Sequence, residues 1–219
     1  NLTAIDQSTD TCTNNFCTLN PLIPNATTLS EGNTKVTYTS GWESVLSTFA
    51  PSQGKWYFEV KVDTLGTASQ IGIVDISQFS NSTYPGNLSR GYSYDQVGDV
   101  YNNASKIFDP YGNSYTSGDI IMVAMDLDNS KLYFGKNGTW QNSSDPTSGA
   151  TGTGAVSISS GYDYTPATSP YAGTHSINFG NPPFTISSGN SDGNGYGNFE
   201  YAVPSSYYSL CTKNLAEYG

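Results

Sequence analysis

The stretch of residues 54–62 constrains the fold more than any other part of the chain, because its apolar side chains recur at every second position. The residues that fall on one face are Trp56, Phe58, Val60 and Val62. Those on the opposite face are Lys55, Tyr57, Glu59 and Lys61. A period of two predicts a half-buried β-strand, since successive side chains of a strand point to opposite faces of its sheet. Nowhere do apolar residues recur at helical spacing for three turns, so we expect little helix.

Other short apolar segments alternate with turn-forming residues along the chain. We expect further strands at 34–38, 71–74, 91–94, 100–101, 120–127, 131–134, 156–158 and 175–180. Asp128-Asn129-Ser130 and Asn137-Gly138 are turn sequences, so the segments on either side should pair as hairpins. Many short strands with turns between them are typical of a β-sandwich or barrel.

The 219 residues show no break in composition, which predicts one domain. Residues 1–35 are polar and contain Pro21 and Pro24, so we expect an irregular N-terminal arm packed on the domain. We assign residues 36–200 to the β-sandwich and residues 201–219 to a C-terminal tail. The sequence begins at Asn1 without a methionine or a secretory segment, and we expect a processed, trimmed or partial chain.

The charge of the chain excludes two classes of partner. The net charge is −10, with only 8 Lys and Arg and no basic cluster. A nucleic-acid binder needs a basic face, and an anionic membrane attracts one, so we expect neither partner. The longest apolar run, residues 120–125, is far too short to span a bilayer, so we expect no membrane insertion.

Three cysteines allow one intramolecular bridge and leave one thiol over. We predict a disulfide between Cys17 and Cys211, because the ends of a sandwich often lie close together, and leave the pairing of Cys12 open. The alternative, that all three are buried or inert thiols, also stays open.

No pattern in the sequence points to a metal, a cofactor or a catalytic site. His175 is the only histidine and no second cysteine pair exists, which argues against zinc. Oxygen ligands alternate from Asp126 to Asn129 as in calcium loops, yet a hairpin turn explains these residues completely. No serine-nucleophile elbow is present that would make a catalytic base of His175. We therefore expect no cofactor, no metal and no enzyme activity.

Seven Asn-x-Ser/Thr sequons are a weak excess over chance in a chain this rich in Asn, Ser and Thr. Glycosylation is an open expectation at Asn1, Asn25, Asn81, Asn87, Asn103, Asn137 and Asn142.

Five segments, in order, resemble the SPRY domain family. They are GKWYFEV at 54–60, IGI at 71–73, GYSY at 91–94, GDIIMVAMDLDN at 118–129 with LYFGKNG at 132–138, and NFG at 178–180 with Pro183-Phe184. Met122 stands where the family often has glycine, which implies a local change in packing. The resemblance covers roughly 60% of the chain, from Gly54 to Phe184. It implies an all-β, two-sheet antiparallel β-sandwich of the concanavalin-like jelly-roll type, with irregular N- and C-terminal extensions, and an activity of protein or peptide recognition through loops at one edge.

The flanks, TNNFCTLNP at 13–21 and VPSSYYSLCTKNL at 203–215, resemble those around SPRY domains encoded by viruses of aquatic bacteria and in environmental sequences. This similarity implies an extracellular or virion-surface location.

Aromatic residues are the best candidates for a binding surface, because Tyr and Trp supply large, rigid contact area. The candidates are Trp42 and Trp140 in turn-rich segments, and Tyr92, Tyr94, Tyr101, Tyr111 and Tyr115 in the segment where SPRY domains build part of their binding edge. An equally weighted alternative is that these rings pack under long loops. Trp56 belongs to the predicted core strand and should be buried.

Three functions from different classes follow. The first is a non-catalytic binding module of a virion or extracellular surface protein that recognises a protein or glycan partner. The second is a structural subunit of an extracellular, glycosylated fibre or shell, which self-associates into an oligomer or filament. The third is a glycan hydrolase that uses a pair of carboxylates.

Overall fold

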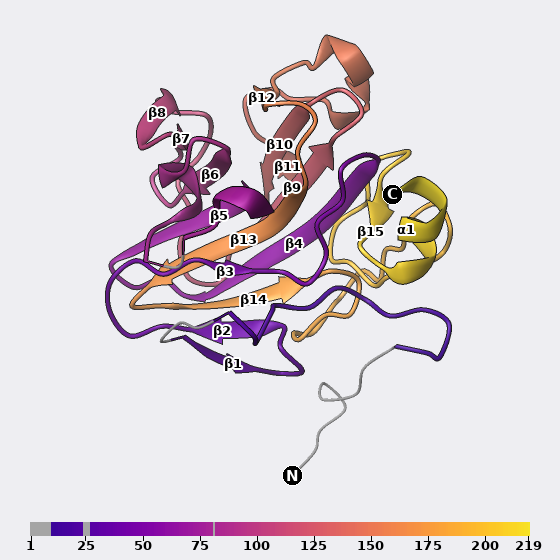
Figure 1. The fold of residues 1–219 in the computed structure, drawn as a ribbon, viewed down its shortest axis with the longest axis horizontal. Helices are drawn as coiled ribbons and strands as arrows, with labels where there is room; N and C mark the ends of the chain where they lie inside the picture. The colour runs from indigo at the N-terminus through magenta and orange to yellow at the C-terminus, as the bar shows by residue number, and fades with distance from the viewer. Residues whose placement is uncertain (1–9, 24–26, 81) are drawn as a thin grey trace.

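Two β-sheets pack face to face in the computed structural model, which describes residues 10–23, 27–80 and 82–219 (Figure 1). The first sheet has nine strands. Seven of them run in the order β1 (Thr28–Ser30), β2 (Lys35–Thr37), β14 (Thr174–Asn178), β4 (Lys55–Thr64), β9 (Ile120–Asp126), β10 (Lys131–Lys136) and β11 (Thr139–Trp140). The other two are β12 (Val156–Ser157), which pairs with β10, and β15 (Tyr208–Ser209), which lies parallel to β4.

The second sheet has six strands. Their order is β3 (Val45–Leu46), β13 (Tyr164–Tyr171), β5 (Ala68–Asp75), β6 (Gly91–Asp95), β7 (Val100–Asn102) and β8 (Ser105–Phe108). Helical structure in the described residues is short: the 3₁₀ turns η2 (Ile76–Gln78), η3 (Pro85–Asn87) and η4 (Pro146–Thr151), and the helix α1 (Thr212–Tyr218). No helix among these residues has the length and apolar character needed to cross a membrane. The predicted all-β sandwich with little helix is confirmed.

The main core lies between the two sheets. The alternating face of β4 predicted from the sequence, from Trp56 to Val62, is buried there. It meets Ile71 and Ile73 of β5 and Tyr94 of β6 from the opposite sheet. Each large apolar side chain buried in this way stabilises the fold by roughly 1.5–3 kcal/mol.

The outer face of β4 is also covered, which the alternating pattern does not reveal. Tyr57 of β4 and Tyr133 of β10 are buried beneath Phe199 and Tyr207 of the C-terminal segment. The ring centroids of Tyr57 and Phe199 lie 5.1 Å apart at 76°. Figure 1 shows this segment, drawn in yellow, beside β4 with α1 outside it.

Strand β13 is the longest one that the sequence did not predict, because it contains Pro166 and Pro170. It pairs with β5 along all eight of its residues, but with β3 at only two. The Pro166 carbonyl accepts from Ser47 N–H at 3.0 Å, on the side of β3. The N–H and C=O of one strand residue point to the same side, so the side on which Pro166 lacks an N–H is also that of β3. Prolines are tolerated there because the ladder with β5 loses no donor.

Parts of the N-terminal arm and of the C-terminal tail are built into the sandwich. Leu19 of the N-terminal arm is buried in the main core, and β1 extends the first sheet. The tail provides β15 and α1. The boundaries at residues 35 and 200 remain predictions.

The predicted Cys17–Cys211 disulfide is wrong, since Cys12, Cys17 and Cys211 are all free thiols. The two segments do lie side by side: Cys17 N–H donates to the Leu210 carbonyl at 2.8 Å, and Phe16 pairs directly with Cys211. Directly paired residues point to the same face and successive residues alternate. Cys17 therefore points away from the face of Cys211, and a bridge would require the backbone to move.

Candidate functional site

Four half-buried aromatic rings form a chain that runs from β13 to β7 of the six-stranded sheet, and we call them the aromatic patch: Trp42, Tyr84, Tyr101 and Tyr171. The ring centroids of Trp42 and Tyr84 are 4.7 Å apart, and those of Trp42 and Tyr171 are 5.3 Å apart at 87°. Tyr84 and Tyr101 lie 6.0 Å apart at 82°. Edge-to-face contacts of this kind are favourable for aromatic pairs, so the rings fix one another.

Backbone anchors bring the distant segments of the patch together. Ser44, which is fully buried, donates its hydroxyl to the Thr83 carbonyl at 2.6 Å and holds the Trp42 segment beside Tyr84. Tyr84 is the N-cap of η3, and the fixed φ of Pro85 favours that turn. Tyr101 lies on β7 and Tyr171 ends β13.

Gly86 of η3 lies so close to the sheet that only glycine fits. A Cβ there would stand 2.4 Å from Ser93 Oγ and 2.5 Å from Tyr101 Cβ. We expect Gly86→Ala to lower the free energy of unfolding by roughly 1–3 kcal/mol through overpacking and to displace Tyr84. Gly193→Ala is the matched control, since its Cβ would meet only the Tyr208 ring at 3.9 Å. Denaturant unfolding of both variants checks this, and equal stability of the two would contradict it.

Acidic groups flank the patch. Asp99, nearly buried, pairs with Lys106 at 2.6 Å. Burial, and then the charge of Asp95, raises the pKa of the Tyr84 hydroxyl and of the Tyr101 hydroxyl. Both hydroxyls therefore stay protonated at neutral pH and can donate hydrogen bonds. At the other end, burial and the Glu43 carboxylate raise the pKa of Tyr38.

Four of the predicted binding tyrosines are core residues instead, as the alternative of packing under loops expected: Tyr92, Tyr94, Tyr111 and Tyr115 are all buried. Tyr94 stacks on Phe134 with centroids 5.4 Å apart at 20°. The hydroxyls of Tyr94 and Tyr111 donate to the carbonyls of Asn113 and Gly154 at 2.5 and 2.9 Å. These rings tie the loops at one end of the sandwich to the core and offer no surface to a partner.

The remaining candidates divide between the two sheets. Trp42 and Tyr101 belong to the aromatic patch, although 59 residues separate them and only Tyr84 joins them. Trp140 lies on the nine-stranded sheet, where it contacts Tyr57 at 6.4 Å and packs with the C-terminal segment. Sequence reasoning missed Tyr84 and Tyr171. The Tyr-Pro pair at 84–85 was the available signal, because it marks a turn that presents a ring.

The described residues contain no group of three or more His, Cys, Asp or Glu side chains that could hold a metal. Asp126 is fully buried and accepts from Lys55 Nζ at 2.8 Å and from Asn129 N–H at 3.0 Å. His175 is buried between Ser69 and Thr168, whose hydroxyls lie 2.9 and 2.5 Å from its ring nitrogens. Burial lowers the pKa of His175 to about 3. It faces no solvent from which a substrate could reach it.

The sequons differ in what their side chains do. Asn87, Asn103, Asn137 and Asn142 are exposed, whereas Asn1, Asn25 and Asn81 lie outside the described residues. Asn137 accepts from Ile120 N–H at 2.8 Å and donates to Asp119 at 2.6 Å, so its amide is engaged in the turn.

Comparison with known proteins finds similarity over the central strands. The SPRY domain family matches residues 55–161. The E3 ubiquitin-protein ligase RKP of Arabidopsis thaliana is 32% identical over 134 residues, which are 60% of this chain and 10% of that protein. The ATP-dependent RNA helicase DDX1 of Xenopus laevis is 34% identical over 97 residues, 44% of this chain and 12% of that protein. The chain thus spans about a tenth of the length of these curated relatives.

Solved structures share the fold. The SPRY domain of human HERC1 aligns with a TM-score of 0.57 and 16% identity, over 73% of this chain and 96% of that one. A second human SPRY domain aligns with a TM-score of 0.52 and 19% identity, over 70% and 94%. The viral or environmental origin suggested by the flanks stays a prediction. Residues 55–161 of this chain thus match the SPRY domain family, and the sandwich that contains them has the fold of solved SPRY domains.

Proposed function

We propose that this chain is a non-catalytic recognition module that binds a protein partner through the aromatic patch. The observation that carries the proposal is the chain of four half-buried rings, Tyr171–Trp42–Tyr84–Tyr101, held rigid by edge contacts and backbone anchors. Rigid aromatic side chains lose little entropy on binding, and Trp and Tyr are the commonest interface hot spots.

The charges beside the patch favour a basic partner segment. Aromatic faces attract Lys and Arg, and Asp95 and Asp99 add negative potential at one end. The net charge of −10 would also speed the approach of a basic partner. We expect a peptide that carries Lys or Arg with an apolar neighbour.

A display library of random peptides tests the proposal. We expect selection on the full chain to enrich basic peptides, and Trp42→Ala to weaken the enriched peptides by at least tenfold, because removing a hot-spot ring costs about 2 kcal/mol or more. Trp140→Ala is the matched control, a half-buried tryptophan on the other sheet, and should bind as the wild type does. Equal loss in both variants, or none in Trp42→Ala, would overturn the assignment of the patch.

We further propose an extracellular or virion-surface location, which the exposed sequons and the low content of charged residues support, 12% of the chain. Expression in a secreting eukaryotic cell should add glycans at Asn87 and Asn103, whose exposed side chains make no hydrogen bond with a described residue that a sugar would break. Asn137 should stay bare in folded material, because its amide holds the turn. Glycopeptide mass spectrometry gives the occupancy, and a fully occupied Asn137 would contradict the ranking.

Self-assembly is the structural alternative, and the edge strand β8 supports it. β8 is the last strand of the six-stranded sheet in the described part of the chain, and Ile107 on it is exposed. Exposed edges accept strands from other chains, although Lys106 in the middle of β8 opposes this. Sedimentation at high concentration separates the two proposals, because a strict monomer excludes self-assembly.

A further inference from the structure

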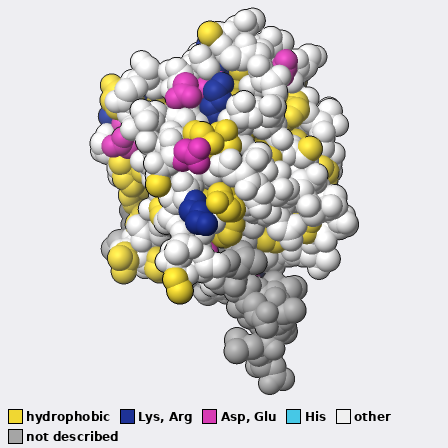
Figure 2. Space-filling view, turned by 90° about the vertical axis from the view of Figure 1, so that its right-hand side faces the viewer, with side chains coloured by type: hydrophobic (Ala, Val, Ile, Leu, Met, Phe, Trp, Pro, Cys, Tyr) yellow, Lys and Arg dark blue, Asp and Glu magenta, His cyan; other side chains and the backbone are white. Residues whose placement is uncertain are grey.

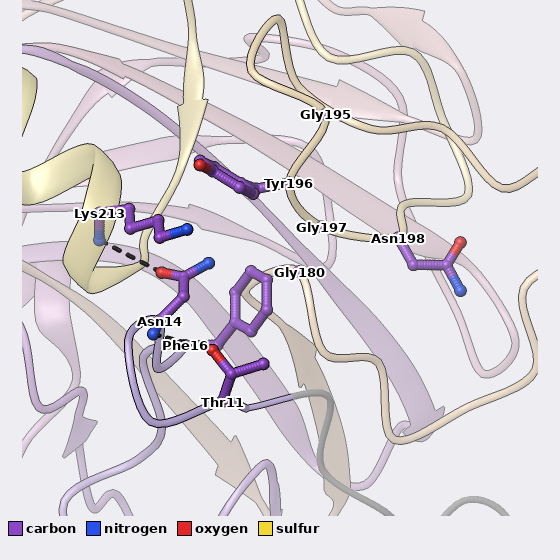
Figure 3. Close-up of a pocket in the computed structure, with 9 residues that line it drawn as sticks. All are labelled: Thr11, Asn14, Phe16, Gly180, Gly195, Tyr196, Gly197, Asn198 and Lys213. Carbon is purple, nitrogen blue, oxygen red and sulfur yellow. Dashed lines mark hydrogen bonds between the residues drawn. The ribbon is translucent and has the colours of Figure 1, made fainter.

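A second site lies where residues 11–16 of the N-terminal arm come close to α1. A pocket of about 280 Å³ opens between the N-terminal arm, the turn after β14, the loop at 195–198 and α1. We call it the terminal pocket (Figure 3). Its volume is at the lower end for ligand sites, so it suits one ring-sized body rather than an extended chain.

Two hydrogen-bond donors converge on the terminal pocket without an acceptor. Asn14 is 8% exposed, and its Oδ1 accepts from Lys213 N–H at 3.2 Å. Its amide nitrogen makes no hydrogen bond with any described residue, and Figure 3 shows it pointing between Phe16 and Lys213. Lys213 forms no ion pair with any described residue, whereas five other Lys and Arg side chains do form ion pairs. Both groups are therefore available to an acceptor that enters the pocket.

Aromatic rings form the walls of the terminal pocket. The Lys213 ammonium lies 5.4 Å from the centroid of the Tyr196 ring, and Phe16 stands below it. Gly180 allows this placement, because a Cβ at that position would meet the Phe16 ring at 2.4 Å. Asp192 holds the loop: its buried carboxylate accepts from Tyr196 N–H at 2.9 Å and from Ser209 N–H at 2.9 Å. The walls are therefore fixed before a ligand arrives.

Figure 2 gives the electrostatic setting of the right-hand side of Figure 1, on which α1 lies. That face is mostly white, with only a few Lys, Arg, Asp and Glu side chains, some of them beside one another.

We infer that the terminal pocket binds a small carboxylate with a ring-sized, partly apolar body, of the uronic-acid class. Two donors match the two oxygens of a carboxylate, whereas a phosphate group carries more charge and is usually held by Arg forks, which the lining lacks. The faces of Tyr196 and Phe16 suit the C–H face of a sugar ring, and the Tyr196 hydroxyl can pair with a sugar hydroxyl.

Chemical-shift titration of the full chain at constant ionic strength tests the inference. The probes are sodium glucuronate, glucose as the same ring without the carboxylate, and acetyl-Ala-Ala as a peptide carboxylate. We expect glucuronate to bind at least tenfold more tightly than either of the others, with shifts at Asn14, Tyr196 and Lys213. Tighter binding of the peptide acid, or equal binding of glucose, would overturn the uronic-acid assignment.

Variants show whether the proposed contacts carry the binding. Lys213→Met should raise the dissociation constant for glucuronate at least tenfold, and Lys61→Met is its matched control. Lys61 also lies 5.4 Å from a ring centroid, that of Phe184, but outside the pocket, so its variant should bind as the wild type does. Asn14→Asp keeps the acceptor for Lys213 N–H but replaces the free donor by a negative charge, and should abolish binding with an unchanged melting temperature. Unaltered affinity in Lys213→Met or in Asn14→Asp would refute the site.

Discussion

Glu59→Ala is expected to lower the free energy of unfolding by roughly 3–5 kcal/mol, because it leaves several buried donors without an acceptor. The Glu59 carboxylate is fully buried on the outer face of β4. Its oxygens accept from the N–H groups of Tyr201 and Glu200 at 2.8 and 3.0 Å, from the Tyr57 hydroxyl at 2.9 Å and from the Asn178 amide at 3.1 Å. This one side chain thus joins the C-terminal segment to the first sheet.

The consequence of losing Glu59 should be local as well as global. Amide hydrogen exchange should accelerate most in residues 199–209, which lie against the outer face of β4. Glu59→Gln fills the same volume but replaces one acceptor by a donor. It should therefore lower the free energy of unfolding by a clearly measurable amount, but by less than Glu59→Ala does. Glu217→Ala, an exposed carboxylate on α1, is the control and should stay within about 0.5 kcal/mol of wild type. A loss under 1 kcal/mol in Glu59→Ala would show that the segment is held by apolar contacts alone.

Acidification from pH 7 to pH 4 should cost the wild-type chain about 3 kcal/mol more than it costs His175→Gln. Burial lowers the pKa of His175 from 6.5 to about 3, although the nearby charge of Asp63 opposes this. Between those two pKa values His175 is protonated in the unfolded chain but neutral in the folded chain. Stability is therefore complete above pH 6.5 and declines as the pH falls toward 3.

Because the chain has a single histidine, no other imidazole titrates in this experiment. Carboxyl groups also titrate in the window: burial raises the pKa of Glu59 and Asp95, whereas hydrogen bonds lower the pKa of Asp75 and Asp119 despite burial. Their contributions are common to both proteins and cancel in the difference. Glutamine keeps a donor and an acceptor for the hydroxyls of Ser69 and Thr168. Denaturant unfolding at several pH values gives the comparison, and parallel pH profiles would show that His175 is not the responsible group.

The aromatic patch illustrates how far sequence patterns reach toward a site. Turn-rich surroundings pointed to Trp42, and Tyr101 lay in the predicted segment, but nothing local distinguished the half-buried Tyr101 from the buried Tyr94. These three residues all lie in strands or turns with alternating neighbours, so the local sequence does not separate a core ring from a surface ring. Which ring faces outward depends on the register of β6 with β7 and on how η3 covers the sheet.

The fold class, the alternating core face of β4, the hairpin turn at Asn137-Gly138 and the similarity to SPRY domains could all be predicted from the sequence, because they depend on residues close together in the chain. The features that join distant segments are visible only in the tertiary structure. They include the position of the β13 prolines on the side of β3 and the opposite directions of the Cys17 and Cys211 side chains. They also include the burial of Glu59 and the hydrogen bond between Asn14 and Lys213. The physical reason is that a side chain's direction follows from its local backbone, whereas its partner follows from the register and covering of sheets across more than a hundred residues.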